Sequence, residues 1–248
     1  MKKSLAIAAI FAAIASQAVG LDLGALTDDE RTTFRDEVRA YLLENPEIIV
    51  EALDILKDRE AQLAADSDVL LVQSNAAALF DAASDWVGGN KNGDITIVEF
   101  MDYQCSYCRK AHDEITELVA SDGNIRFILK EYPILGETSD LAARFTIAVR
   151  QIAGDDAYKA AHDALMTLRA EISAAALARI ASDLGLDPAT VNAKMQSGDV
   201  TAVIDANRAL GAAMQVNGTP TFIVDQTMLR GYVPLDGMRQ IVSDERNG

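Results

Sequence analysis

The residues of this 248-residue chain best suited to chemistry are Cys105-Ser106-Tyr107-Cys108, which contain both of its cysteines. Two thiols three residues apart at the start of a helix share one face and can close a short disulfide. At a helix N-terminus Cys105 would face unpaired backbone N–H groups, which stabilise a thiolate and lower its pKa below the free value of about 8.5. Cys108, one turn further on, would be the buried resolving thiol. The spacing therefore predicts redox exchange.

Other roles for this pair are weaker. A structural disulfide that closes so short a loop contributes only about 2 kcal/mol in the chain-entropy model. A zinc site would have to recruit His112 and His162, the only two histidines, and their spacing on separate predicted helices is poor for zinc. The sequence thus predicts neither a metal site nor a bound cofactor. Handling of copper through the soft thiols remains an alternative.

Two further features fit redox exchange. Glu99 precedes Cys105 by six residues, and an inward-pointing carboxyl there could take or relay the proton of Cys108. The alternative is a carboxylate at the strand rim in water. Thr219-Pro220 precedes a predicted strand, and a cis bond at this site would expose the Thr219 backbone to an extended substrate peptide. A trans proline that simply opens the strand is the alternative there.

The elements around these residues predict an α/β domain over residues 91–248. Residues 94–101 (DITIVEFM) form a strand buried on both faces, and helical spacing over 105–120 leads to a second strand at 125–130. An alanine-rich helical insertion then covers about 139–216. An antiparallel pair at 221–224 and 228–231 and a final helix from Pro234 complete the domain.

Residues 21–90 predict an acidic helical extension. Thr27 and Glu30 form a capping-box pattern, and Asn45-Pro46 reads as the N-cap and first residue of a second helix. Apolar residues recur every seven positions along that helix, at Ile49, Leu56, Leu63, Leu70 and Ala77. This narrow stripe either packs on the neighbouring domain or pairs with the same segment of another chain.

Charge and the N-terminal segment limit the classes of protein. The formal charge of −16 excludes a nucleic-acid binder by bulk electrostatics. Residues 1–20 carry two lysines, an apolar run and small residues, which is typical of a secretory signal peptide cleaved after Ala18 or Gly20. The apolar run is about half of the ~20 residues needed to cross a bilayer. The sequence therefore predicts an exported protein in the periplasm, where a disulfide can persist.

Three segments carry a resemblance to a known family: IVEFMDYQCSYC, KEYPILGETSDLAARF and VNGTPTFIV, in this order. They resemble the DsbA family of exported bacterial thiol-disulfide oxidoreductases. The resemblance implies a thioredoxin-like fold with an inserted all-helical domain. It also implies that Cys105 is the nucleophile, that Cys108 resolves the mixed disulfide, that Glu99 lies buried beneath the pair, and that a cis Pro220 with Thr219 faces it. By a weaker transfer, Lys130 is expected near the acid.

The N-terminal extension resembles that of ScsC-type DsbA-like proteins, in which such a segment oligomerises the chain and favours isomerase activity. Between the cysteines stands Ser-Tyr, whereas strongly oxidising members carry a histidine there. The resemblance thus implies a disulfide oxidase or an isomerase/reductase. Its partners would be exported cysteine-containing substrates and a membrane redox protein that resets the pair. Outside the enzymes, an envelope binding or chaperone-like protein is the alternative.

Overall fold

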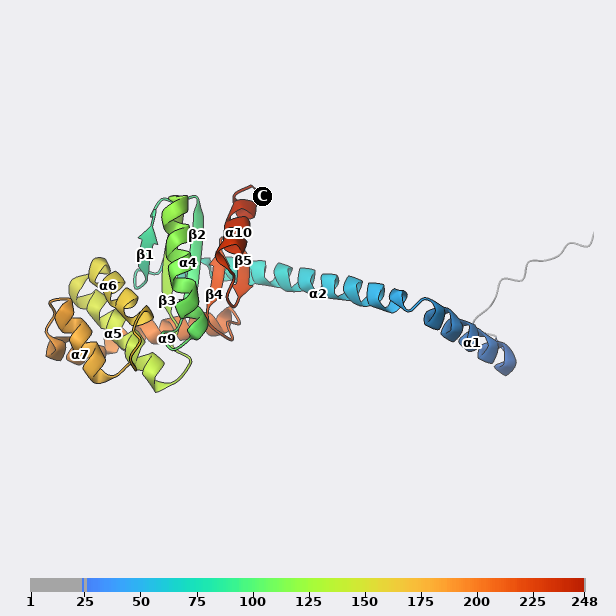
Figure 1. Cartoon of the computed structure of the whole chain (residues 1–248), viewed down its shortest axis with the longest axis horizontal. Helices are drawn as coiled ribbons and strands as arrows, with labels where there is room; N and C mark the ends of the chain where they lie inside the picture. The colour runs from blue at the N-terminus through green and yellow to red at the C-terminus, as the bar shows by residue number, and fades with distance from the viewer. Residues whose placement is uncertain (1–23, 25, 248) are drawn as a thin grey trace, which may run out of the picture. The chain divides into compact units, whose positions relative to one another are not determined.

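The computed structural model describes residue 24 and residues 26–247, and the chain divides into two compact units, residues 1–59 and 60–248 (Figure 1). The predicted signal peptide, residues 1–20, lies outside the described residues. Among the helices that are described, none is both long enough and apolar enough to cross a membrane.

The first unit consists of α1 (Asp28–Glu44) and the beginning of α2 (Glu47–Ser74). The predicted capping box is confirmed: the Thr27 hydroxyl accepts from the Glu30 backbone N–H at 3.3 Å, and the Glu30 carboxylate accepts from the Thr27 N–H at 2.8 Å. The prediction that Asn45 caps α2 is wrong. Its side-chain amide donates to the Tyr41 carbonyl at 2.9 Å, so Asn45 ends α1 instead.

The second unit is built on a five-stranded mixed sheet with the strand order β1-β3-β2-β4-β5. Only β2 and β3 run parallel, and α4 (Ser106–Asp122) connects them as a crossover helix. The strands are β1 (Trp86–Gly89), β2 (Ile95–Met101), β3 (Ile125–Glu131), β4 (Thr221–Val224) and β5 (Thr227–Arg230). The predicted α/β architecture is confirmed, with both predicted central strands and the terminal hairpin in place.

Strand β1 was not predicted. Gly88 and Gly89 indicate a turn in the sequence, yet they pair antiparallel with β3 at the edge of the sheet. The remainder of α2 and the short α3 (Ala76–Phe80) also lie in the second unit. The predicted stripe is therefore one residue too long, because α2 ends at Ser74 and Ala77 lies in α3. Residues 60–90, which the sequence assigns to the extension, therefore belong to the same compact unit as the sheet.

Helices follow β3, as predicted, before the chain returns to the sheet. The helices of this insertion are α5 (Glu137–Ala153), α6 (Asp155–Met166), α7 (Ala174–Asp183), α8 (Pro188–Met195) and α9 (Gly198–Ala213). The chain ends with α10 (Leu235–Asn247), which packs beside α4. Figure 1 shows α5, α6 and α7 grouped at one end of this unit, beyond β3.

The alternation of β2 decides which side chains meet the cysteines. Ile97 and Met101 belong to the same apolar core as Cys105 and Cys108, whereas Val98 and Phe100 belong to the core on the opposite face of the sheet. Glu99 follows the parity of Ile97 and Met101 and so points to the face covered by α4. Each fully buried apolar side chain of this size contributes about 1.5–3 kcal/mol, which fixes the register of β2 firmly.

Candidate active site

The two cysteines lie where β2 passes into α4. Cys105 is the N-cap of α4, and its Sγ accepts a hydrogen bond from the Cys108 backbone N–H at 3.4 Å. The two thiols are not bonded to each other in this structure. The Asp102 carboxylate fixes the loop between β2 and α4, because it accepts hydrogen bonds from the backbone N–H groups of Gln104 at 2.8 Å and Ile134 at 2.9 Å. A loop after β3 is thereby held beside the cysteines.

The surroundings of Cys105 favour its thiolate. A hydrogen bond from the Cys108 thiol lowers the pKa of Cys105 to about 5, and the Thr219 side chain and the Cys108 and Tyr107 backbone N–H groups act in the same direction, while burial opposes them. These amides are the unpaired donors of the first turn of α4. A thiolate at neutral pH is the nucleophile in disulfide exchange.

Cys108 has the opposite character. Its side chain is fully buried, and burial raises its pKa well above the ordinary value, followed by the hydrogen bond to Cys105 and the charge of Glu99. The pair thus combines a thiol of lowered pKa at Cys105, which is 7% exposed, with a fully buried thiol of raised pKa at Cys108.

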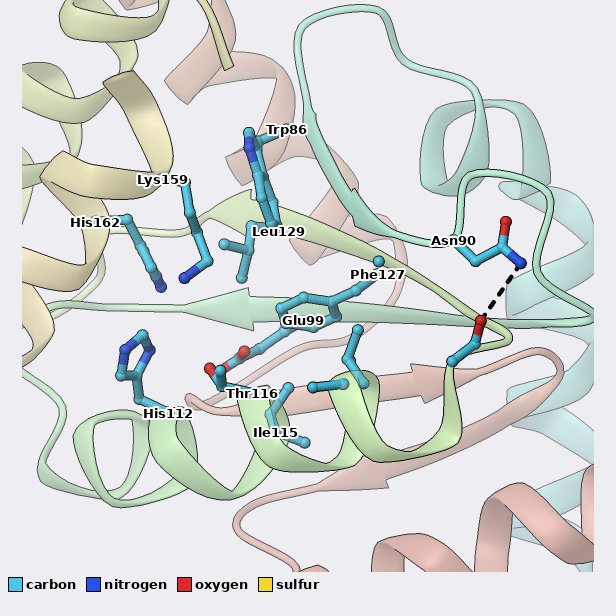
Figure 2. A pocket seen from close by; sticks show the side chains of 14 residues that line it. Trp86, Asn90, Glu99, His112, Ile115, Thr116, Phe127, Leu129, Lys159 and His162 are labelled. Atoms are coloured by element: carbon cyan, nitrogen blue, oxygen red, sulfur yellow. Dashed lines mark hydrogen bonds between the residues drawn. The ribbon is translucent and has the colours of Figure 1, made fainter. Parts of the chain in front are cut away.

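Glu99 points inward, as one of the two sequence interpretations expects, and is only 4% exposed. Burial raises the pKa of Glu99 to about 8, with further contributions from the charges of Cys105 and Glu131. No hydrogen bond reaches its carboxyl from any residue that the structure describes. The carboxyl lines a cavity of about 440 Å³ between α4, α6 and the sheet, which Figure 2 shows. A neutral carboxylic acid therefore lies within electrostatic reach of both cysteines.

Thr219 and Pro220 face the same pair. The peptide bond between them is cis, and the Cys105 thiol donates to the Thr219 carbonyl at 3.0 Å. The Thr219 hydroxyl is buried without a hydrogen-bond partner. The structure thus brings together four of the predicted site residues, Cys105, Cys108, Thr219 and Pro220, and holds Glu99 in the core below them.

The expectation that Lys130 lies near this acid is wrong. In β3 the side chain of Lys130 faces away from Glu99, and its ammonium donates to the Asp85 carboxylate and, at 2.5 Å, to the Ala78 carbonyl. Ala78 belongs to α3, whose Leu79 shares a core with Ile128 on the face of the sheet opposite the cysteines, and Asp85 directly precedes the edge strand β1. The two-residue alternation of a strand explains the outcome, because Lys130 is offset by one position from Leu129, the register partner of Glu99.

Sequence reasoning missed a second buried carboxyl. Glu131 Oε1 accepts hydrogen bonds from Tyr103 at 2.9 Å, Thr146 at 2.7 Å and Tyr158 at 2.7 Å. Burial raises the pKa of Glu131 to about 7 despite these donors. Tyr103 also contacts His162 Nδ1 at 3.0 Å. No spacing in the sequence indicates this network, because its members come from β3, α5, α6 and the loop before α4.

Two family models match the chain. The model described as a DSBA-like thioredoxin domain matches residues 96–243, and the model described as the N-terminal domain of the copper resistance protein ScsC matches residues 30–62. The first match covers more than half of the chain and contains every predicted site residue.

Solved structures agree with the family match. A thioredoxin-like oxidoreductase from Silicibacter pomeroyi DSS-3 is 38% identical, with a TM-score of 0.64 over 69% of this chain and 98% of its own. The thiol-disulfide exchange protein alpha-DsbA2 from Wolbachia pipientis is 25% identical, with a TM-score of 0.68 over 74% of this chain and 98% of its own. BcfH from Salmonella enterica Typhimurium is 27% identical, with a TM-score of 0.72 over 88% of this chain and 96% of its own.

Curated relatives include a Na⁺/H⁺ antiporter from Salinispora arenicola, 29% identical over 168 residues, but the chain spans only about a quarter of the length of that protein. The match is therefore to a part of the antiporter, and it carries no transport activity to this chain. Taken with the fold and the cysteine pair, the family match shows that the chain belongs to the DSBA-like thioredoxin domain family of thiol-disulfide oxidoreductases.

Proposed function

We propose that this protein is an exported thiol-disulfide oxidoreductase that exchanges disulfides with protein substrates through Cys105 and Cys108. The main observation in support is the contrast between the two thiols: the pKa of Cys105 is lowered to about 5, whereas burial raises the pKa of Cys108. Such an asymmetric pair fixes which sulfur is attacked and which one leaves into the interior.

Oxidation of a substrate begins from the disulfide form of the pair. A substrate thiolate attacks Cys105 Sγ, the bond between Cys105 and Cys108 breaks, and its electron pair passes to the Cys108 sulfur. Because Cys108 is enclosed, its thiolate must be neutralised, and we assign the proton to Glu99, whose raised pKa of about 8 keeps it protonated at neutral pH. The product of this step is a mixed disulfide between the substrate and Cys105.

The second step releases the substrate. Another substrate thiolate attacks the substrate sulfur of the mixed disulfide, and Cys105 leaves as the thiolate that its surroundings stabilise. Two electrons have then moved from the substrate dithiol to the cysteine pair. In the reductive direction the Cys105 thiolate attacks a substrate disulfide, forms a mixed disulfide and releases one substrate thiolate. Glu99, after it has lost its own proton to solvent, accepts the proton of Cys108, and the Cys108 thiolate then attacks Cys105 Sγ and releases the second substrate thiolate. In isomerisation the released substrate thiolate instead attacks another substrate sulfur, and Cys105 leaves again as the thiolate.

Thr219 and Pro220 are proposed to hold the substrate backbone. Once Cys105 is ionised or bonded to substrate sulfur, its thiol no longer donates to the Thr219 carbonyl, which is then free to accept a substrate N–H. The reaction needs no bound cofactor. A membrane redox protein in the periplasm would have to reset the pair after each turnover.

Trapping of intermediates tests the function. In buffer with oxidised glutathione, the Cys108→Ser variant should form a mixed disulfide between Cys105 and glutathione, and a thiolate of a reduced, unfolded protein should then displace the glutathione thiolate from Cys105. The resulting mixed disulfide with the protein should accumulate, because the resolving thiol is gone. The Cys105→Ser variant keeps one cysteine but should trap none. The lowered pKa of Cys105 predicts an equilibrium potential less negative than the about −270 mV of thioredoxin. Equal trapping by both variants, or a pair that glutathione cannot reduce, would contradict the proposal.

We further propose that the N-terminal helices join copies of this chain. No residue of α1 is buried, and large apolar side chains are exposed along α1 and α2, among them Tyr41 at 58%, Leu53 at 51% and Leu63 at 69%. On α2 the seven-residue spacing keeps Ile49, Leu56, Leu63 and Leu70 on one stripe, as partner helices require. Exposure of so much apolar surface is otherwise costly in water.

Light scattering on the mature chain tests this assembly. We expect a mass above that of the monomer, and we expect Leu56→Glu together with Leu63→Glu to reduce it to the monomer. Ala61→Glu adds a charge to the exposed side of the same helix opposite the stripe and should leave the mass unchanged. A monomeric wild-type chain would contradict the proposal and assign the stripe to packing within one chain.

A further inference from the structure

Two histidines from different helices meet beside the cavity. His112 of α4 and His162 of α6 have ring centroids 5.1 Å apart, and His112 Nε2 lies 3.2 Å from the Asp163 carboxylate. One potential ligand atom from each of these three residues lies within 4.8 Å of the other two. The sequence spacing does not indicate this arrangement, because the two histidines are 50 positions apart and only the packing of α4 against α6 brings them together.

The hydrogen bonds of His162 leave one ring nitrogen available. Tyr103 lies 3.0 Å from His162 Nδ1 and 2.9 Å from Glu131 Oε1. Tyrosine has one hydroxyl hydrogen, and we assign it to the carboxylate, so the Tyr103 oxygen accepts from His162 Nδ1–H. The lone pair of His162 then lies on Nε2. An imidazole oriented by a hydrogen bond on its other nitrogen is the common arrangement at metal sites.

The cavity provides room next to these side chains. His112, His162, Lys159 and Glu99 all line it, and Figure 2 shows both imidazoles on the same side of the cavity with the Glu99 carboxyl across from them. The Glu99 side chain is 4% exposed, and its carboxyl has no hydrogen-bond partner among the described residues. A cation held by the histidines would thus have an open coordination position toward a cavity with an unpartnered acid.

We propose that His112, His162 and Asp163 form a binding site for one divalent metal ion of the zinc class. Two imidazoles and a carboxylate suit such an ion, and three protein ligands leave the fourth tetrahedral position open to the cavity. Donor atoms around tetrahedral zinc lie about 3.4 Å apart, so the side chains must close in from their present separation of up to 4.8 Å. His112 Nε2 already lies 3.2 Å from the Asp163 carboxylate, so the movement required is a closer approach of these two groups to the His162 imidazole.

Lys159 competes with the metal. Its ammonium contacts both Asp163 oxygens at 2.6 Å, and it must leave the carboxylate before a divalent ion can bind there. The Lys159 side chain is 34% exposed and can turn to solvent. Removal of this cation should therefore strengthen metal binding, a sign opposite to that expected for removal of a ligand.

Zinc titration of a cysteine-free protein tests the site. The Cys105→Ser/Cys108→Ser chain, freed of any affinity tag, is titrated with Zn²⁺ in buffer with excess Mg²⁺ to occupy acidic surface groups. Because the chain has only two histidines, a long-range ¹H–¹⁵N spectrum contains two imidazole spin systems. We expect one equivalent of Zn²⁺ to shift both of them.

Matched variants decide the ligands. His112→Gln and Asp163→Asn should each weaken Zn²⁺ binding at least about tenfold, whereas Lys159→Gln should strengthen it severalfold. Lys91→Gln removes an equal charge from an ion pair outside the cavity and should change nothing. Unfolding transitions verify that each variant is folded, and Asp163→Asn tests the site if His112→Gln does not fold. Unshifted imidazole resonances, or unchanged affinity in both ligand variants, would overturn the proposal.

Discussion

The Sγ of Cys105 lies 3.0 Å from the carbonyl oxygen of Thr219, a residue 114 positions further along the chain. This contact joins the N-terminus of α4 to the loop before β4 at the reactive sulfur. The Thr219 hydroxyl is buried beside it with no partner. A buried hydroxyl without a partner costs free energy, and a thiolate at Cys105 would supply the missing acceptor.

Two substitutions of Thr219 distinguish the effect of its hydroxyl on the pKa of Cys105 from the effect of its backbone. Thr219→Val keeps the shape and the carbonyl contact but removes the hydroxyl, so we expect the pKa of Cys105 to rise by about 1–2 units if a hydrogen bond to the charged sulfur is lost. Thr219→Ser retains the hydroxyl and should leave the pKa near that of the wild type. Thiolate absorbance at 240 nm, recorded against pH, measures both variants. Equal titrations of the two variants would assign the effect of Thr219 to its backbone.

The Cys108 thiol is the largest contributor to the lowered pKa of Cys105, and two small substitutions test it. Cys108→Ser keeps an O–H donor next to Cys105, whereas Cys108→Ala has none. We therefore expect the pKa of Cys105 to be higher in the alanine variant than in the serine variant, by about 1–2 units for a hydrogen bond to a charged group. The pH dependence of alkylation by iodoacetamide measures the pKa in both. If the two variants titrate together, the helix N-terminus rather than the thiol stabilises the thiolate.

The raised pKa of Glu99 should make the free energy of unfolding depend on pH. Its pKa is about 8 in the folded chain against an ordinary 4.5, so between these values the native state holds a proton that the unfolded chain has lost. The contribution of Glu99 to the free energy of unfolding should therefore be greatest below pH 4.5. It should fall as the pH rises towards 8, by at most about 5 kcal/mol. Glu131, with a pKa raised to about 7, acts in the same direction.

Glu99→Gln should remove most of that decline. Urea denaturation of the Cys105→Ser/Cys108→Ser chain between pH 4 and 9, with and without Glu99→Gln, measures it free of thiol titration. The amide imposes a cost that does not vary with pH, so the slope is the quantity to compare. Identical slopes would mean that Glu99 is ionised or hydrated in solution, and Glu99 could then not serve as the proton donor to Cys108.

Much of this molecule could be predicted from local sequence patterns. The β-branched run before Cys105, the cysteine spacing and the Thr219-Pro220 pair gave correct positions for β2, α4 and β4, because hydrophobic period and turn chemistry are local properties. Strand β1 was missed for the same reason. Gly88 and Gly89 have no strand propensity, and only pairing with β3 makes them a strand.

Contacts between distant segments explain the other differences. Whether Glu99 faced water or the core depended on the helix that covers β2. The meeting of His112 with His162 and the network of Glu131 likewise need the packing of α4, α5 and α6, which no spacing encodes. The position expected for Lys130 from the family resemblance was wrong, because side chains alternate along β3 and Lys130 lies on the face of the sheet opposite Glu99.

Lys130 and Asp85 provide the last prediction. Both side chains are almost fully buried, and removal of one partner leaves an uncompensated charge in the core. Lys130→Met should therefore lower the free energy of unfolding by about 3–5 kcal/mol, and the double variant Lys130→Met/Asp85→Leu should recover part of it, because no buried charge remains. Urea denaturation measures the stabilities. The pair faces the side of the sheet opposite the cysteines, so the thiolate titration of Cys105 should not change in the folded variants. A shift in that titration as large as the one caused by Cys108→Ala would mean that Lys130 influences the active site after all.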